Sequence, residues 1–554
     1  MKLTLVRDDE TRLTRRRLLA VAAGTAGGLT IAAGSVGYRI GTHDSGGAST
    51  DAGSASATTT PTSTASTTTE TSGSGAGRFR SRPDLQPPPV QVTHLFGSDR
   101  SPEPDSNATS PQQTGTTSAP QLAPYYFLTP KAYTPSAPIN YQVGPMIIEP
   151  TGHVVWFQPS AQPIQKRAMD LRVQTYRGQP VLTWYEGKSA NGYGKGTAKI
   201  VDSHYTTVAT IKAVGGLKVD LHEFRITSRD TALITAYRTS TTDLTAIRGL
   251  RRGTIVSGVV QEIDIATGRL IFSWDSLDHV SPEMTYKKAS ADPTTQLDYF
   301  HINSIDEIDE HTLLISSRNT CAVYKIDKRT GKIIWQLGGK KSDFEHQVGT
   351  RFYYQHSASM VGVDEVLLFD NGGSPAMEPQ SRALRLKINT DAHTVTMVRS
   401  LTHPAKLLSV TMGNVNQLTN GHYVVGWGSE PYFSEYAADG SLLLDAKMPN
   451  NIQSYRAFGA DWIGNPTDKP ALAVGTNAAG GATVYISWNG ATRVATWRVR
   501  AGGTKAGLKH HATAARQGFE TAVAVNSTGP YFQALAVDKN GHELGRSEIV
   551  KATV

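Results

Sequence analysis

His222-Glu-Phe-Arg-Ile, His301-Ile-Asn-Ser-Ile and His356-Ser-Ala-Ser-Met are three segments of one kind. Each opens on histidine and is followed in the sequence by a polar turn and then by a more apolar run. A fourth copy opens on Gly413. A short strand, a turn and a second strand are typical of a β-hairpin. The sequence therefore predicts equivalent hairpins repeated along the chain.

The spacing of these hairpins predicts a ring of sheets. Short strands that recur with a period of about 55 residues are typical of a β-propeller, in which each blade is a four-stranded sheet and the innermost strands line a channel. Six segments are candidates for innermost strands, and they start at Asp170, His222, His301, His356, Gly413 and Ser454. The sixth is expected to return as Ala471-Leu-Ala-Val. We thus predict an all-β protein with a six-bladed β-propeller over residues 121–480.

A second recurring phrase marks the outer strands. A Thr-Gly or Asp-Gly turn precedes an apolar run that often holds tryptophan, as in Asp327-Lys-Arg-Thr-Gly-Lys-Ile-Ile-Trp335. Glycine supplies the positive φ that such hairpin turns require.

After residue 480 the pattern changes to period-2 strands, which predict a small fibronectin III-like β-sandwich over 481–554. The loop 275–297 fits two alternatives, a lid over the channel or an ordinary surface excursion.

The N-terminal part of the chain is predicted to lie outside the folded domains. Residues 1–40 contain Thr14-Arg-Arg-Arg-Leu-Leu19 and a weakly apolar run, which match a twin-arginine signal that is either cleaved or kept as a membrane anchor. Residues 41–120 are rich in Ser, Thr and Pro and are expected to form a disordered linker. The protein is therefore expected to be exported by the twin-arginine route and to act outside the cell or at its surface.

Composition excludes several classes of protein. The chain has 554 residues, 38% of them apolar, and a net charge of +8, without a Lys/Arg stripe that would indicate nucleic acid. The single cysteine, Cys321, excludes an intramolecular disulfide and a cysteine metal cluster. No spacing of His, Asp and Glu demands a metal, although three histidines can bind one. Neither a phosphate-binding loop nor a Gly-x-Ser-x-Gly elbow is present. We expect no cofactor.

The histidines are the candidate site. If they start equivalent inner strands, their side chains meet at the channel mouth. Asn303 follows His301 by two positions and is expected on the same face of the strand, and Arg318 ends the return strand of that hairpin. These groups predict a pocket for an oxyanion, with a neutral imidazole as a competent nucleophile toward sulfur or phosphorus. Which histidine attacks stays open. Tyr455 and Arg456 are further candidates, of which alternation allows only one to face the channel.

Several short motifs resemble the bacterial arylsulfate sulfotransferase family. They are Asp298-Tyr-Phe-His301-Ile-Asn303-Ser-Ile, Arg318, Gln355-His356-Ser-Ala-Ser, Phe369-Asp-Asn-Gly372 and Tyr455-Arg-Ala. The resemblance extends from about residue 125 to 480. It implies a six-bladed propeller enzyme that needs no nucleotide sulfate donor and moves a sulfuryl group from a phenolic sulfate ester to another phenol. Its partners would be a small aryl sulfate donor and a phenolic acceptor.

The resemblance also implies roles for single residues. His356 matches the family's transient sulfohistidine, so transfer would be ping-pong. His301, Asn303 and Arg318 match its sulfate-binding groups, and His222 matches the remaining channel histidine, a candidate general acid and base. Two conditions would apply: His356 must be neutral, and a hydrogen bond to its other nitrogen should fix the tautomer. The family's sulfate-contacting hydroxyls have no unambiguous counterpart, although Ser409 and Thr411 lie near.

Two other functions stay open from the sequence. The first is a cell-surface propeller that binds a ligand without turnover. The second is a metal-dependent propeller hydrolase or lyase that uses the three histidines as ligands.

Overall fold

The computed structural model describes residues 79–96, 121–133, 139–161, 166–478 and 480–552. These segments form β-strands and three single-turn 3₁₀ helices, with no α-helix among them. The predicted all-β class is therefore confirmed. In the described segments, no helix has the length and apolar character needed to cross a membrane. The predicted twin-arginine signal or anchor, and the linker at 41–78 and 97–120, lie outside the described residues.

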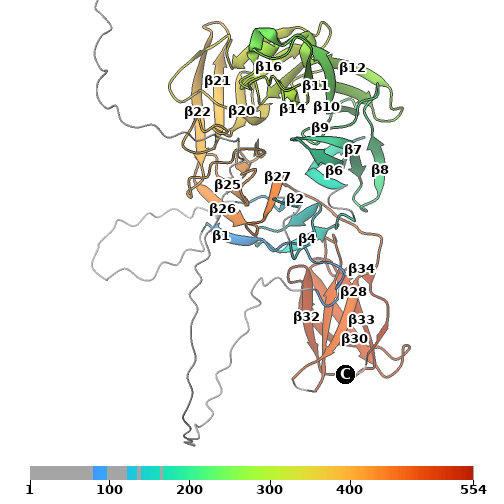
Figure 1. Ribbon diagram of the computed structural model, residues 1–554. Coiled ribbons are helices and arrows are strands. Elements are labelled where there is room, and N and C mark those ends of the chain that lie inside the picture. The colour runs from blue at the N-terminus through green and yellow to red at the C-terminus, as the bar shows by residue number, and fades with distance from the viewer. Residues whose placement is uncertain (1–78, 97–120, 134–138, 162–165, 479, 553–554) are drawn as a thin grey trace, which may run out of the picture. The chain divides into compact units, whose positions relative to one another are not determined.

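Six sheets follow one another around a ring in residues 91–460 (Figure 1). The innermost strand of each sheet contacts the innermost strand of the next, and the sixth contacts the first, so the ring is closed. The innermost strands are β5 (Arg167–Tyr176), β9 (Phe224–Ile226), β14 (Ile302–Glu307), β19 (His356–Met360), β23 (Asn414–Gln417) and β27 (Ile452–Ala460). All six begin at or near the positions predicted from the hairpin repeat.

In the first five sheets the chain runs outward from the innermost strand through three antiparallel strands. The first three sheets continue through β6 (Gln179–Ala190), β7 (Tyr193–Val201) and β8 (Thr207–Ile211); β10 (Thr231–Thr242), β11 (Gly253–Asp264) and β12 (Leu270–Asp275); and β15 (Thr312–Ser317), β16 (Ala322–Asp327) and β17 (Ile333–Gly338). The fourth and fifth continue through β20 (Glu365–Asp370), β21 (Arg382–Asn389) and β22 (Thr394–Thr402), and through β24 (Tyr423–Gly426), β25 (Tyr432–Tyr436) and β26 (Leu442–Lys447). Two short strands, β13 (Gln296–Asp298) and β18 (Glu345–His346), add parallel to β11 and β22.

The sixth sheet corrects the predicted topology. Its innermost strand β27 pairs with β2 (Tyr125–Ala132), which continues into β3 (Met146–Ile148) and β4 (Val154–Phe157). The predicted return through Ala471 was wrong. Pairing a strand from the start of the ring with one from its end closes the ring, and it buries Tyr126, Phe127 and Leu128 completely.

Part of the predicted linker is also folded. Strand β1 (Gln91–Leu95) pairs with β26 at the outer edge of the fifth sheet. Leu85 and Val90 are buried in the same apolar cluster as residues of the sixth sheet. The prediction of a disordered linker up to residue 120 was therefore wrong for residues 79–96, because this Pro-rich stretch carries enough apolar side chains to pack.

The glycine turns lie where the sequence predicts them. The phrases join the third and fourth strands of their sheets, counted from the innermost strand, and in the sixth sheet these strands are β3 and β4. Their glycines have positive φ, as the turn requires: Gly152 (83°), Gly268 (73°), Gly331 (71°) and Gly440 (95°).

Two further sheets follow the ring, with orders β28-β29-β32 and β31-β30-β33-β34, the latter extended by β35. Both contribute to one apolar cluster that includes Trp497 and Phe532, so they pack as a sandwich. The strands are β28 (Ala471–Thr476), β29 (Ala482–Ser487), β30 (Thr496–Gly502), β31 (Lys509–Ala515), β32 (Glu520–Val525), β33 (Tyr531–Val537), β34 (Glu543–Arg546) and β35 (Val550–Lys551). The predicted boundary at 480 was wrong, because β28 belongs to this C-terminal sandwich and lies before residue 480. The likeness of the sandwich to a fibronectin III module stays a prediction.

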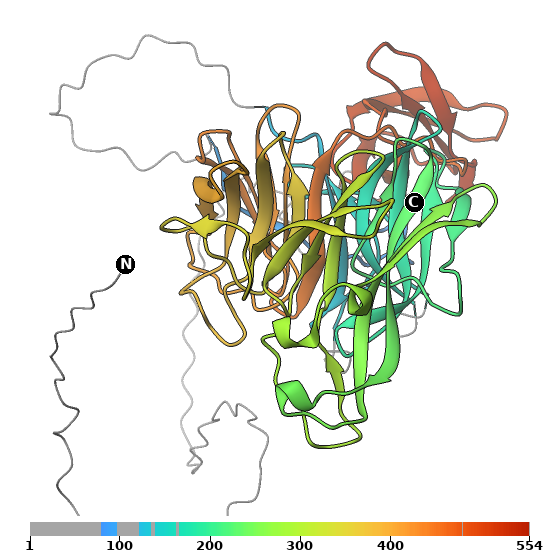
Figure 2. The same ribbon diagram turned by 90° about the horizontal axis from the view of Figure 1, so that it is seen from above.

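One end of the ring carries a long excursion. The long β10–β11 hairpin is part of it, and so is loop 275–297 after β12, which holds the short helices η2 (Ser276–Asp278) and η3 (Pro282–Met284). Figure 2 shows this green part of the chain extending beyond the neighbouring sheets. Strand β13 then brings the chain back to β11, directly before His301.

Candidate functional site

A cavity of about 580 Å³ lies where the innermost strands begin. The residues that line it include five of the seven predicted site residues: His222, His301, His356, Arg318 and Tyr455. Asn303 and Arg456 do not reach its wall. The cavity, rather than a single motif, therefore brings together groups from four different sheets.

The three histidines converge as predicted. His222 lies two residues before β9, His301 lies directly before β14, and His356 is the first residue of β19. All three are buried, and one ring nitrogen of each lies within 4.8 Å of those of the other two. The ring centroid of His222 is 4.9 Å from that of His301 and 6.4 Å from that of His356. This triangle of nitrogens could hold a metal ion, or it could surround a reacting group.

A neutral amide fixes the tautomer of His356. Asn371, the residue after β20, places its Oδ1 2.6 Å from Nδ1 of His356. The amide nitrogen of Asn371 donates to the carbonyls of Ser409 (2.7 Å) and Met412 (2.9 Å), so its oxygen must face the histidine. Nδ1 of His356 therefore carries the hydrogen, and Nε2 keeps a lone pair. Burial and the nearby Arg318 cation lower the pKa of His356 well below its ordinary value, so the ring is neutral at pH 7.

Carboxylates support the other two histidines. Oδ2 of Asp220 lies 2.6 Å from Nδ1 of His222, and Oδ2 of Asp298 lies 2.5 Å from Nδ1 of His301. Burial opposes the charge of Asp220, but His222 and other donors hold the pKa of this carboxyl below its ordinary value. Burial lowers the pKa of His301, although Asp298 acts in the opposite direction. An imidazole with a carboxylate partner is a stronger base than one with an amide partner, so the three rings are not equivalent.

Arg318 supplies positive charge to the cavity. It follows β15, and it donates to the side-chain oxygen of Asn319 (3.0 Å) and the carbonyl of Val410 (3.1 Å). No carboxylate in the described segments forms an ion pair with it, and its Nε has no hydrogen-bond partner there. Burial lowers the pKa of Arg318, but a guanidinium remains charged at neutral pH. A buried cation without a carboxylate favours an anionic ligand.

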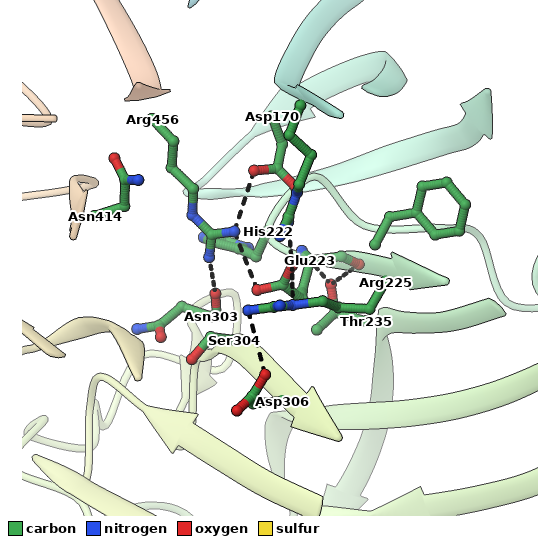
Figure 3. A network of polar contacts seen from close by, with 12 residues as sticks. Asp170, His222, Glu223, Arg225, Thr235, Asn303, Ser304, Asp306, Asn414 and Arg456 are labelled. Carbon is green, nitrogen blue, oxygen red and sulfur yellow. Dashed lines mark hydrogen bonds and ion pairs between the residues drawn. The ribbon is translucent and has the colours of Figure 1, made fainter. Parts of the chain in front are cut away.

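Tyr455 and Arg456 point in different directions, as strand alternation requires. Tyr455 lines the cavity and donates from its hydroxyl to the carbonyl of His222 (3.1 Å). Arg456 lies behind the wall, where Nη1 contacts Asp170 (3.1 Å) and Glu223 (3.0 Å) (Figure 3). Arg456 was therefore wrongly predicted to bind substrate. Its charge is matched by two buried carboxylates.

Asn303 also supports the site from behind. Its Nδ2 donates to the carbonyl of Gln355 (2.7 Å), which fixes the residue before His356. The prediction that Asn303 shares a face with His301 failed, because His301 has a φ of 55° and the register shifts between Ile302 and Ser304. A left-handed residue and a bulge break the alternation of a regular strand.

Loop 275–297 forms part of the cavity wall through Lys287, Lys288, Gln296 and Leu297. Of the two alternatives left open by the sequence, the structure therefore favours a covering role over a surface excursion. Thr411 lines the cavity as well, whereas the hydroxyl of Ser409 donates to the Thr411 carbonyl.

Sequence reasoning missed four residues of the site. Asp220 and Asp298 precede their histidines by two and three positions, and this proximity was a usable signal. Asn371 lies within a quoted motif but received no role. Lys131 lines the cavity from β2 and gave no signal, because its strand joins the ring only through the closing pair.

Comparison with known proteins gives one family match. The model of the arylsulfotransferase (ASST) family matches residues 172–448, and no curated protein matches the chain. Among solved structures, the chain is similar to a protein of unknown function from Bacteroides caccae, with 11% identity, a TM-score of 0.36, and coverage of 60% of this chain and 98% of that chain. It is also similar to virginiamycin B lyase from Staphylococcus aureus, with 9% identity, a TM-score of 0.28, and coverage of 67% and 91%. Likeness at this level carries no functional information.

Proposed function

Because the chain belongs to the arylsulfotransferase family, we propose that it moves a sulfuryl group from an aryl sulfate ester to a phenolic acceptor through a covalent sulfohistidine at His356. The observation that carries the choice of nucleophile is the difference between the partners of the three histidines. Asn371 keeps His356 neutral with a free Nε2, whereas Asp220 and Asp298 make the other two rings better suited to hold a proton.

The first half-reaction follows from these positions. The lone pair of Nε2 of His356 attacks sulfur, and the bond between sulfur and the aryl oxygen breaks. The oxygen leaves with the bonding pair as a phenolate and takes a proton from the imidazolium of His222. Arg318 and His301 stabilise the charge on the sulfuryl oxygens, as preorganised donors do in other group transfers.

The second half-reaction reverses these steps. The acceptor phenol loses its proton to neutral His222, and its oxygen attacks the sulfur of the sulfohistidine. The bond between nitrogen and sulfur breaks, and its electron pair returns to Nε2 of His356. Both histidines end in their starting protonation states, so the cycle balances without a cofactor.

Fold and location complete the proposal. The six sheets would be the blades of a β-propeller, and the C-terminal sandwich would be a fibronectin III-like module. Export would follow the twin-arginine route, with residues 1–40 either cleaved or retained as an anchor. The closed ring of innermost strands supports the propeller, the apolar cluster shared by the two C-terminal sheets supports a sandwich, and the Arg15-Arg16-Arg17 sequence supports the export route.

The proposal is tested by intact mass of the full chain after brief mixing with 4-nitrophenyl sulfate. We expect a gain of about 80 Da, the mass of one sulfuryl group, with one equivalent of nitrophenol, since a covalent intermediate gives a burst. Addition of phenol should then remove the adduct and yield phenyl sulfate. A ligand-binding propeller without turnover would give neither adduct nor nitrophenol.

The three converging nitrogens support a second candidate, a metal-dependent hydrolase or lyase. The same experiment distinguishes it when run after extensive chelation. Sulfuryl transfer should continue unchanged after chelation, whereas a metal enzyme would lose its activity and regain it with Zn²⁺.

Asn371 should act as a positioning residue for His356. Asn371→Leu removes the acceptor that holds Nδ1–H, and we expect the rate of adduct formation to fall about 10- to 100-fold, as for other partners of functional histidines. Asn371→Asp keeps an acceptor but adds a negative charge, which raises the pKa of His356. This variant should still form the adduct, with the acidic limb of its pH–rate profile moved to higher pH. A residue with only a packing role would give equal losses and no shift of the profile.

A further inference from the structure

We propose that the cavity contains a second anion subsite at Lys131, and that the enzyme therefore favours aromatic substrates that carry an acidic group besides the sulfuryl group in transfer. This inference rests on the proposed function and names its substrate class.

Lys131 is a buried cation on the cavity wall. It lies on β2, opposite Gln453 on β27, and only 8% of the residue is exposed. In the described segments its ammonium makes neither an ion pair nor a hydrogen bond to protein. A lysine is rarely buried without a partner, so its position points to a ligand.

Arg167 adds to this positive charge. It begins β5, and no carboxylate in the described segments pairs with it. Burial, together with the positive charge of Arg167, lowers the pKa of Lys131 to about 7. An anion bound at Lys131 would offset both effects.

The charges on the whole wall lead to the same class of substrate. Four cationic side chains line the cavity, namely those of Lys131, Lys287, Lys288 and Arg318. The one carboxylate among the lining residues, that of Asp298, is hydrogen-bonded to His301. A simple aryl sulfate brings a single negative charge, which Arg318 is placed to meet. A second acidic group would use the positive charge that remains at Lys131.

The position of Lys131 fits an aromatic substrate held between the two anion sites. Across the β2–β27 pair, Lys131 stands opposite Gln453, two positions before Tyr455, whose ring lines the same cavity beside His222. The reacting oxygen would point to the histidines, and the acidic group would lie farther along the wall. Because donor and acceptor occupy the cavity in turn, the subsite would act on both.

The test compares two matched acceptors with 4-nitrophenyl sulfate as the donor. One is 3-(4-hydroxyphenyl)propanoate, and the other is its uncharged amide. The full chain should show a higher kcat/KM for the acid by about 10- to 100-fold, the range expected for a hydrogen bond to a charged group. Lys131→Met should lower the kcat/KM of the acid much more than that of the amide and so remove this preference, and Lys131→Arg should restore part of it. Lys332→Met, at an exposed turn, is the matched control and should keep the full preference.

The outcomes separate this inference from the proposed function. Adduct formation from 4-nitrophenyl sulfate needs no acceptor, so its absence in the wild type would contradict the sulfotransferase itself. Normal adduct formation with equal use of acid and amide would overturn the Lys131 subsite alone. If Lys131→Met lowers the kcat/KM of both acceptors equally while its adduct still forms at the wild-type rate, the residue supports the fold of the cavity and the inference is wrong.

Discussion

His356→Ala is expected to abolish the covalent adduct and to lower sulfuryl transfer from 4-nitrophenyl sulfate by about 10⁴-fold or more, the scale seen when a nucleophile is removed from a catalytic unit. The reason is that the ring of His356 is neutral and that its Nδ1 is held by an amide, whereas the other two histidines of the cavity have carboxylate partners. Its Nε2 therefore keeps a lone pair. Without it, the remaining ring nitrogens belong to His222 and His301, whose carboxylate partners favour the protonated ring over a nucleophilic one. Intact mass and nitrophenol release measure the two parts of this expectation.

His222→Gln provides the informative comparison. Nitrophenolate is a good leaving group and departs without a proton, so this variant should still form the adduct. Transfer of the adduct to phenol should be slow, since His222 no longer accepts the phenol proton. If His356→Ala forms the adduct and His222→Gln does not, the nucleophile is His222, and the role assigned to Asn371 falls with it.

The fold was predictable where the signal is local. The hairpins, the glycine turns and the order of five sheets follow from patterns within about 50 residues of sequence. The closure of the ring was not predictable, because β2 and β27 are separated by the whole ring and their pairing depends on tertiary contact. Ala471-Leu-Ala-Val has the same apolar pattern as a return strand, so the sequence alone could not assign it to the C-terminal sandwich.

The site, like the fold, was predictable where the signal lies in a local sequence pattern. The common register of the three histidines was enough to predict that they meet. The failures occurred where backbone geometry departs from a regular strand, as at His301, whose positive φ turns Asn303 toward Gln355. Asn371 contacts His356 from a loop, and Lys131 reaches the cavity from the closing strand; no spacing in the sequence reports such positions.

Arg456→Met should lower the free energy of unfolding by about 3–5 kcal/mol, the cost of removing one partner from a buried ion pair. Asp170 and Glu223 have side chains that are 3% and 1% exposed, and both pair with Arg456 (Figure 3). Both also pair with Arg172. The variant leaves the two buried carboxylates with Arg172 as their shared cation, and Arg225 remains 3.6 Å from Glu223. Urea denaturation of wild type and variant measures the difference, and Arg329→Met, which removes an exposed pair with Asp327, should cost far less stability.

The pKa of Glu223 determines how the loss of stability in Arg456→Met depends on pH. Burial opposes the charge of Glu223, but Arg172 and Arg456 lower its pKa to about 2 in the folded protein. A depressed pKa contributes stability above the unfolded value of about 4.3, and this contribution is lost as pH falls toward 2. Without Arg456 the pKa of Glu223 rises, so the difference between wild type and variant should be largest near pH 7 and smaller near pH 4. Adding Glu223→Gln to Arg456→Met should recover part of the lost stability, because the unpaired charge is gone. If Arg456→Met instead loses the same free energy of unfolding at pH 7 and pH 4, Arg456 stabilises the ring by packing alone.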